Sequence, residues 1–197
     1  MRSHLGLRNL HIGSWRSAAV AVLALLIAVL VGAAAPVAAP PDDLDPLLRA
    51  LSIRPWWGDP PAVPVAALDG RRQSLSELRG QVALLYFWAT WCPICTGELP
   101  TGIEALHREF RDRGLVVWAI SFREAPERVT AWLDRHPVSL RVMVDPDGIA
   151  ATAFRATATP TFVLVDRHGQ LVGRGAGPRE WTGERGHALI RALLDGR

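Results

Sequence analysis

The chain has very few cysteines. Only two of its 197 residues are cysteine, Cys92 and Cys95. A structural zinc site is disfavoured, because it needs four ligands and no second cysteine pair exists. Covalent haem attachment requires a histidine directly after the second cysteine, and Thr96 stands there. A purely structural disulfide is disfavoured as well, because closing so short a loop stabilises a fold little. Redox chemistry and the binding of a soft metal ion remain open.

The sequence also lacks a concentration of one charge. Its 22 basic and 19 acidic residues give a net charge of +3, and many of the arginines are scattered singly among acidic residues. This pattern excludes a dedicated nucleic-acid-binding stripe, so no nucleic-acid partner is expected. A hydrophobic fraction of 49% with eight tryptophans excludes a disordered chain. The length suits one globular domain with an appendage.

The amino terminus has the pattern of a targeting segment. Three arginines, at positions 2, 8 and 16, precede an apolar run from Ala18 to Val31. This pattern predicts a signal peptide or membrane anchor over residues 1–35. The run is short for a membrane span, which needs about 20 residues. Pro36 and Pro40 disfavour cleavage after Ala35 or Ala39, whereas a cleavage site after Ala33 has no proline next to it. A cleaved signal peptide and an uncleaved anchor therefore both stay open, with a slight preference for the anchor. The proline-rich residues 36–62 are predicted to form a tether, and the folded domain is expected over residues 63–197.

The two cysteines follow the most apolar stretch of the domain. Residues 82–89 are continuously apolar, aromatic or β-branched, which predicts a strand buried on both faces. Pro93 suits the first position of a helix. Residues three apart lie on one side of a helical turn, so Cys92 and Cys95 should be within disulfide reach. The helix start should stabilise a Cys92 thiolate, while Cys95 should be more buried and act as the resolving thiol.

Strands and helices alternate along the rest of the domain. This alternation, followed by a closing hairpin and helix, predicts a three-layer α/β domain with a mixed sheet. Pro100 is expected to kink the helix that begins at the dithiol. The predicted elements are a strand pair turning at Asp69-Gly70, a short helix over 76–79, a helix from Cys92 to about Arg113, a strand over 115–121, a helix after Pro126, a strand over 140–144, a helix near 149–154, strands over 161–165 and 170–173, and a helix over 182–194.

Two stretches resemble the thioredoxin superfamily. They are residues 87–95 (FWATWCPIC), with Pro100, and residues 158–162 (ATPTF). More narrowly, they are similar to the membrane-anchored TlpA/ResA-like thiol:disulfide oxidoreductases of bacteria. The likeness covers about Val63 to the carboxyl end and implies a thioredoxin-like fold with a central strand-helix insertion. It also implies a cis peptide bond at Pro160, beside the dithiol, where the backbone of Thr159 would hold a partner peptide.

The resemblance also suggests a role for Glu98. This residue follows Cys95 by three, so it shares the helix face of the dithiol, and the ResA-like proteins suggest an acid there that tunes the thiols and carries protons. An ordinary solvated glutamate is the alternative. Thioredoxins have a buried aspartate where this chain has Tyr86, and a neutral phenol cannot act as a base near pH 7. Glu98 is therefore the better candidate for proton transfer.

Two residues beside the cysteines are expected to contact partner proteins. Trp91 is predicted to be exposed and, with Pro93, to form part of an apolar docking surface. Trp88 also flanks the site, but a tryptophan on a buried strand is more often a core residue.

The leading hypothesis is an enzyme that exchanges disulfides with proteins. Cys92 would attack a partner disulfide and Cys95 would release the reduced partner. Resemblance favours reduction of periplasmic proteins, such as apocytochromes before haem loading, on the outer face of the bacterial inner membrane. It implies a membrane electron donor and no cofactor beyond the redox-active disulfide. The alternative is a copper(I) metallochaperone that uses the same two thiolates, although that reading leaves the nearby proline unexplained.

Overall fold

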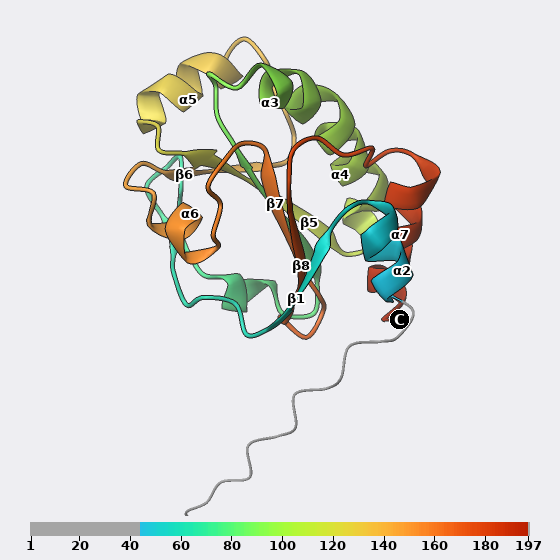
Figure 1. Cartoon of the computed structure of the whole chain (residues 1–197). Helices are drawn as coiled ribbons and strands as arrows, with labels where there is room; N and C mark the ends of the chain where they lie inside the picture. The colour runs from blue at the N-terminus through green and yellow to red at the C-terminus, as the bar shows by residue number, and fades with distance from the viewer. Residues whose placement is uncertain (1–43, 197) are drawn as a thin grey trace, which may run out of the picture. The chain divides into compact units, whose positions relative to one another are not determined.

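A fully buried strand, β4 (Val82–Trp88), runs through the middle of the domain and ends just before the cysteine pair. This computed structural model describes residues 44–196 (Figure 1). The expected signal or anchor over residues 1–35 lies outside the described residues. Within them, no helix is both long and apolar enough to cross a membrane.

The described residues form an eight-stranded sheet in the order β1-β8-β7-β4-β5-β6-β2-β3. The three strands β4, β5 and β6 are parallel, and the other neighbours are antiparallel. The sheet is therefore mixed, as predicted. Besides β4, its strands are β1 (Arg54–Gly58), β2 (Val65–Ala67), β3 (Arg72–Gln73), β5 (Leu115–Phe122), β6 (Arg141–Asp145), β7 (Thr161–Val165) and β8 (Leu171–Ala176).

Helices cover both faces of this sheet. One face packs against α2 (Leu44–Ala50), α4 (Glu104–Phe110), α5 (Pro126–Leu133) and α7 (Glu184–Asp195). The other face packs against the 3₁₀ turn η1 (Leu75–Leu78) and α6 (Ile149–Ala153). In Figure 1, α6 lies on the opposite side of the strands from α2 and α7. The predicted three-layer α/β fold is confirmed, and α5, β6 and α6 lie between β5 and β7, where the extra strand and helix were expected.

The helix that follows the dithiol changes its geometry at Pro100. It begins as α3 (Pro93–Glu98), widens into a π-helical turn over Leu99–Ile103, continues as α4, and ends in a 3₁₀ turn over Arg111–Arg113. Proline has no N–H to donate and its ring clashes with the preceding turn, so the regular hydrogen-bond ladder is interrupted there. A kink was expected at Pro100, and the structure has a π-helical turn there.

The segment expected to be a tether differs from that expectation over residues 44–58. There the chain forms α2 and β1, and β1 pairs with β8 with Arg54 opposite Arg174. Helix α2 packs on α7 and buries Leu44 and Leu48. The leucines of this segment have helical spacing, which the surrounding prolines obscured. The fold therefore begins at or before Leu44 and not at Val63.

Candidate active site

The cysteine pair lies where β4 passes into α3. Cys92 caps the helix with an extended backbone, and Pro93 takes the first helical position. The two cysteines form a disulfide with their Cα atoms 5.2 Å apart. The backbone N–H of Cys95 donates to the Cys92 Sγ over 3.2 Å. An N–H donor at a helix start favours the anionic form of a sulfur, so the arrangement suits a Cys92 thiolate when the bond is reduced.

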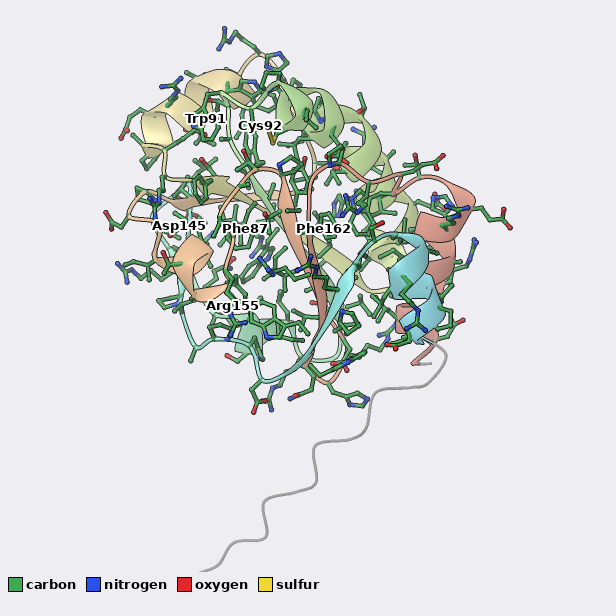
Figure 2. The ribbon with its side chains drawn as sticks, viewed as in Figure 1. Phe87, Trp91, Cys92, Asp145, Arg155 and Phe162 are labelled. Atoms are coloured by element: carbon green, nitrogen blue, oxygen red, sulfur yellow. A yellow bond between two sulfur atoms is a disulfide. The ribbon has the colours of Figure 1, made fainter. Side chains whose placement is uncertain are left out.

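The surroundings of the pair are apolar and partly exposed. Cys92 is 5% exposed and Cys95 is fully buried, which is the expected order. Trp91 and Ile94, which are close to Cys92 in the sequence, are 53% and 50% exposed although both are large and apolar. Figure 2 shows Trp91 and Cys92 together at the start of α3. Trp88 is fully buried and packs on Trp132, so it belongs to the core. Ile94 was not singled out from the sequence.

Thr159 and Pro160 come to the same end of the sheet. Strand β7 runs antiparallel to β4 with Thr161 opposite Phe87, so the residues just before β7 lie beside the end of β4 that carries the dithiol. The Thr159–Pro160 peptide bond is cis. Pro160 is buried, whereas Thr159 is half-buried. The Pro160 carbonyl accepts a hydrogen bond from the Gly177 N–H, which ties this loop to the end of β8.

Glu98 and Tyr86, which the sequence treated separately, are in direct contact. The Tyr86 hydroxyl donates to Glu98 Oε2 over 2.7 Å, and the Arg179 N–H lies 3.3 Å from Oε1. Tyr86 is fully buried. Burial of the phenol and the negative charge of Glu98 raise the pKa of Tyr86 far above its ordinary value. The tyrosine is therefore a neutral hydrogen-bond donor, and the carboxylate is the acceptor.

Sequence reasoning missed Glu124. This residue follows β5, is 5% exposed, and accepts hydrogen bonds from the Thr90 N–H (2.8 Å), the Thr90 hydroxyl and the Ser121 hydroxyl. Arg128 Nε pairs with it at 3.3 Å. Parallel strands β4 and β5 end at the same edge of the sheet. The sequence did offer a signal, because Glu124 is an acidic residue just after β5, at the edge of the sheet that also carries the cysteines.

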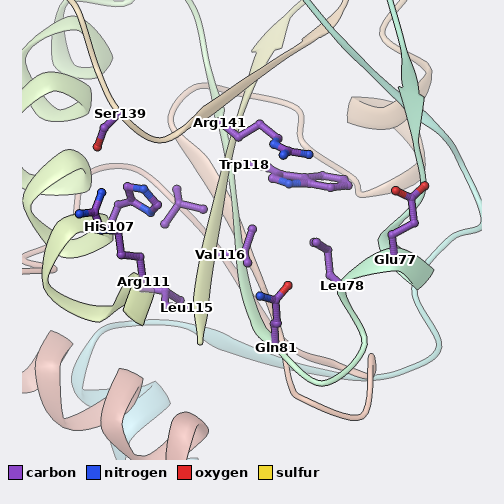
Figure 3. A pocket seen from close by; sticks show the side chains of 11 residues that line it. Glu77, Leu78, Gln81, His107, Arg111, Leu115, Val116, Trp118, Ser139 and Arg141 are labelled. Carbon is purple, nitrogen blue, oxygen red and sulfur yellow. The ribbon is translucent and has the colours of Figure 1, made fainter. Parts of the chain in front are cut away.

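A hollow elsewhere on the domain is separate from this site. Figure 3 shows it at the beginning of β5, lined among others by His107, Arg111, Trp118 and Arg141. The dithiol lies at the other end of the sheet, where the parallel strand β4 finishes. The residues of the hollow thus have no place in the chemistry of the cysteines.

Comparison with known proteins identifies the family. The AhpC/TSA family model matches residues 59–174. The chain belongs to the AhpC/TSA family. It is 32% identical over 140 residues to the thiol:disulfide interchange protein DsbE homolog of Paracoccus denitrificans, covering 70% of this chain and 73% of that one. It is 31% identical over 105 residues to the thiol-disulfide oxidoreductase ResA of Halalkalibacterium halodurans.

The last match covers 53% of this chain and 59% of the ResA protein, so the chain spans about six-tenths of that relative. Among solved structures, a putative thiol:disulfide interchange protein DsbE from Chlorobium tepidum matches with a TM-score of 0.64 and 26% identity. That match covers 71% of this chain and 98% of the other. The thioredoxin-like fold and the expected relationship to ResA-like thiol:disulfide oxidoreductases are confirmed.

Proposed function

We propose that the chain is a thiol:disulfide oxidoreductase that exchanges disulfides with partner proteins through Cys92 and Cys95. The observation that carries the proposal is the disulfide at the start of α3, in which the Cys95 N–H donates to the Cys92 sulfur. The names of the relatives, thiol-disulfide oxidoreductase and thiol:disulfide interchange protein, support the same activity. The reaction needs no cofactor beyond the cysteine pair.

The reaction proceeds through a mixed disulfide. The Cys92 thiolate attacks one sulfur of the partner's disulfide, and the other partner sulfur leaves as a thiolate. Cys95 then loses its proton to the Glu98 carboxylate and attacks the Cys92 Sγ, which releases the second partner thiolate. The partner gains two electrons and, from Glu98 and water, two protons. The chain is left with the Cys92–Cys95 disulfide, the state seen here.

The direction proposed is reduction of partners outside the cytoplasm. The apolar segment behind the arginines at positions 2, 8 and 16 supports export to the periplasmic side of the inner membrane, anchored or secreted. Resemblance to ResA-like proteins supports the reduction of apocytochromes during cytochrome c maturation, or of similar targets. Each cycle then requires a dithiol donor, proposed to be a membrane protein, to return Cys92 and Cys95 to thiols.

The proposed docking surface for these partners consists of Trp91, Pro93 and Ile94, together with Thr159 and Pro160 just before β7. Trp91 and Ile94 are half exposed although both are large and apolar. Exposed aromatic and aliphatic side chains next to a reactive group are typical anchors for a partner. The half-buried Thr159 supplies a backbone edge for an extended peptide.

Trapping of partners tests the assigned roles. In Cys95→Ala the mixed disulfide cannot be resolved, so covalent complexes should accumulate on a non-reducing gel, whereas Cys92→Ala should give none. Equal trapping by the two variants would refute the roles. Stoichiometric, tight copper(I) binding without disulfide reductase activity would instead support the metallochaperone.

The redox state of the pair in cells tests the direction. Thiol alkylation followed by measurement of the mass shift reports the fraction of chains with free thiols. A mostly reduced pair is the expected result for a reductase with a dithiol donor. A mostly oxidised pair in actively growing cells would point to the opposite direction.

A further inference from the structure

The Glu98 carboxylate is held by two donors that come from outside its own helix. Tyr86 reaches it from β4, at 2.7 Å, and the Arg179 N–H reaches it from the loop after β8, at 3.3 Å. The Tyr86 distance is in the range of a hydrogen bond from a hydroxyl to a charged oxygen. Both oxygens are thus engaged, one by each donor, which fixes the orientation of the carboxyl plane.

The guanidinium of Arg179 is directed to other partners. Its Nη1 donates to the carbonyls of Gly177 and Pro178, its Nη2 donates to the Ser52 carbonyl, and the group lies over the Phe162 ring. Among residues 44–196, no ion pair within 4.0 Å includes Glu98. Glu98 is therefore oriented by a hydroxyl and a backbone amide, and no basic side chain of the described residues forms an ion pair with it.

The position of Glu98 relative to the resolving thiol follows from the helix. Cys95 and Glu98 are three residues apart in α3, so they are neighbours on its surface. Tyr86 and Cys95 belong to the same buried cluster on that side of the sheet. A carboxylate fixed in this position is well placed to accept a proton from Cys95.

We infer that Tyr86 is a positioning residue, whose buried hydroxyl holds the Glu98 carboxylate on the dithiol face of α3 while Cys95 gives up its proton. The inference rests on the proposed function and adds one step to it. The proton passes from the Cys95 thiol to Glu98, and from there to water or the departing thiolate. Tyr86 itself neither loses nor gains a proton.

The experiment uses the reduced full-length protein and oxidised glutathione as the disulfide. Formation of the Cys92–glutathione mixed disulfide and its resolution by Cys95 are followed separately, by acid quench and mass, across pH. General-base catalysis contributes about 10²–10⁴-fold, so Glu98→Gln should slow resolution by at least about 100-fold. Tyr86→Phe, which removes only the hydroxyl, should slow resolution by about 3- to 10-fold, shift its pH profile, and leave formation unchanged.

The double variant separates positioning from general destabilisation. If Tyr86 acts through Glu98, Tyr86→Phe/Glu98→Gln should resolve as Glu98→Gln alone does. Thr130→Val, which removes a hydroxyl bonded to the Pro126 carbonyl on α5, is the control and should change neither step. The inference would be overturned if Tyr86→Phe slowed resolution as much in the Glu98→Gln background as in the wild type. It would also be overturned if Tyr86→Phe left the pH profile of resolution unchanged. Glutathione exchange that persists in Cys92→Ala would overturn the proposed function instead.

Discussion

The buried carboxylate of Glu124 accepts a hydrogen bond from the backbone N–H of Thr90, two residues before Cys92. The same carboxylate binds the Ser121 hydroxyl at the end of β5 and pairs with Arg128 on α5. Arg128 Nε in turn lies 3.1 Å from the Thr90 hydroxyl oxygen. Three segments that are distant in sequence are joined at this point. The backbone of the loop that carries Trp91 and Cys92 is therefore held by Glu124, which belongs to another part of the chain.

Removing this carboxylate should destabilise the domain. Glu124→Ala leaves the Thr90 N–H and the Ser121 hydroxyl without a partner, and an unsatisfied buried polar group costs about 1–3 kcal/mol. Urea unfolding of the oxidised protein measures the loss. Glu127→Gln, an exposed change in the first turn of α5, is the matched control and should have little effect. Similar midpoints for the two variants would show that Glu124 does not anchor the loop.

Truncation of Trp91 should affect binding of protein substrates, whereas truncation of Trp88 should affect stability. Trp91→Ala should leave the free energy of unfolding within about 0.5 kcal/mol of the wild type, because the side chain is half exposed. Its effect should be a higher KM for protein disulfides. Trp88→Ala should cost about 3–5 kcal/mol, because it empties a site in the core. A normal KM in Trp91→Ala would remove this residue from the docking surface.

Glu104 should make stability depend on pH on the acid side. Burial favours its neutral form, but hydrogen bonds from the Ser139 hydroxyl, the Ser139 and Leu140 N–H groups and Arg108 outweigh it and lower the pKa of Glu104 below its usual 4.5. Because the folded-state pKa is depressed, this stabilisation is complete above the unfolded-state pKa and is lost as the pH falls through the folded-state value.

The comparison with Glu104→Gln tests this linkage. The variant should be less stable than the wild type at pH 7, and the difference should shrink as the pH is lowered below about 4.5. Urea midpoints at several pH values provide the measurement. A difference that stays constant down to acid pH would mean that the carboxylate's charge contributes nothing.

Leu48 should be a core residue although it lies in the segment expected to be a tether. It is fully buried where α2 packs on α7, so Leu48→Ala should destabilise the domain by about 2–5 kcal/mol. Arg49→Ala, next to it on the exposed side of α2, breaks only a surface ion pair with Asp45 and should cost well under about 1 kcal/mol. If thermal melts of the two variants coincide, α2 is not part of the folding unit.

The sequence predicted the features that local patterns determine. The apolar stretch at 82–89 became a buried strand, Pro93 opened the helix with Cys92 as its cap, and Pro100 interrupted the regular turn. These outcomes depend on residues within one or two turns of each other. The family motifs around Cys92 and Pro160 added the thioredoxin-like fold with its central insertion and the cis peptide bond at Pro160.

Contacts between distant segments could not be predicted in the same way. Tyr86 and Glu98 meet because β4 and α3 fold back on each other, and Glu124 meets Thr90 across 34 positions of sequence. The spacing of apolar residues along the sequence does not indicate which distant polar residues will meet in the fold. The α2–β1 segment was missed for another reason, because the surrounding prolines obscured the helical spacing of its leucines, and so short a helix depends on its packing against α7.

Through Ser52, the α2–β1 segment is also connected to the active site. Its carbonyl holds the Arg179 guanidinium, and the Arg179 N–H holds Glu98. A shortened protein starting at Val63 would retain both sulfurs and the cis proline, yet the Arg179 guanidinium would lose its hydrogen bond to the Ser52 carbonyl. Such a fragment should still form the Cys92–Cys95 disulfide, but the rate at which Cys95 releases its partners should depend differently on pH.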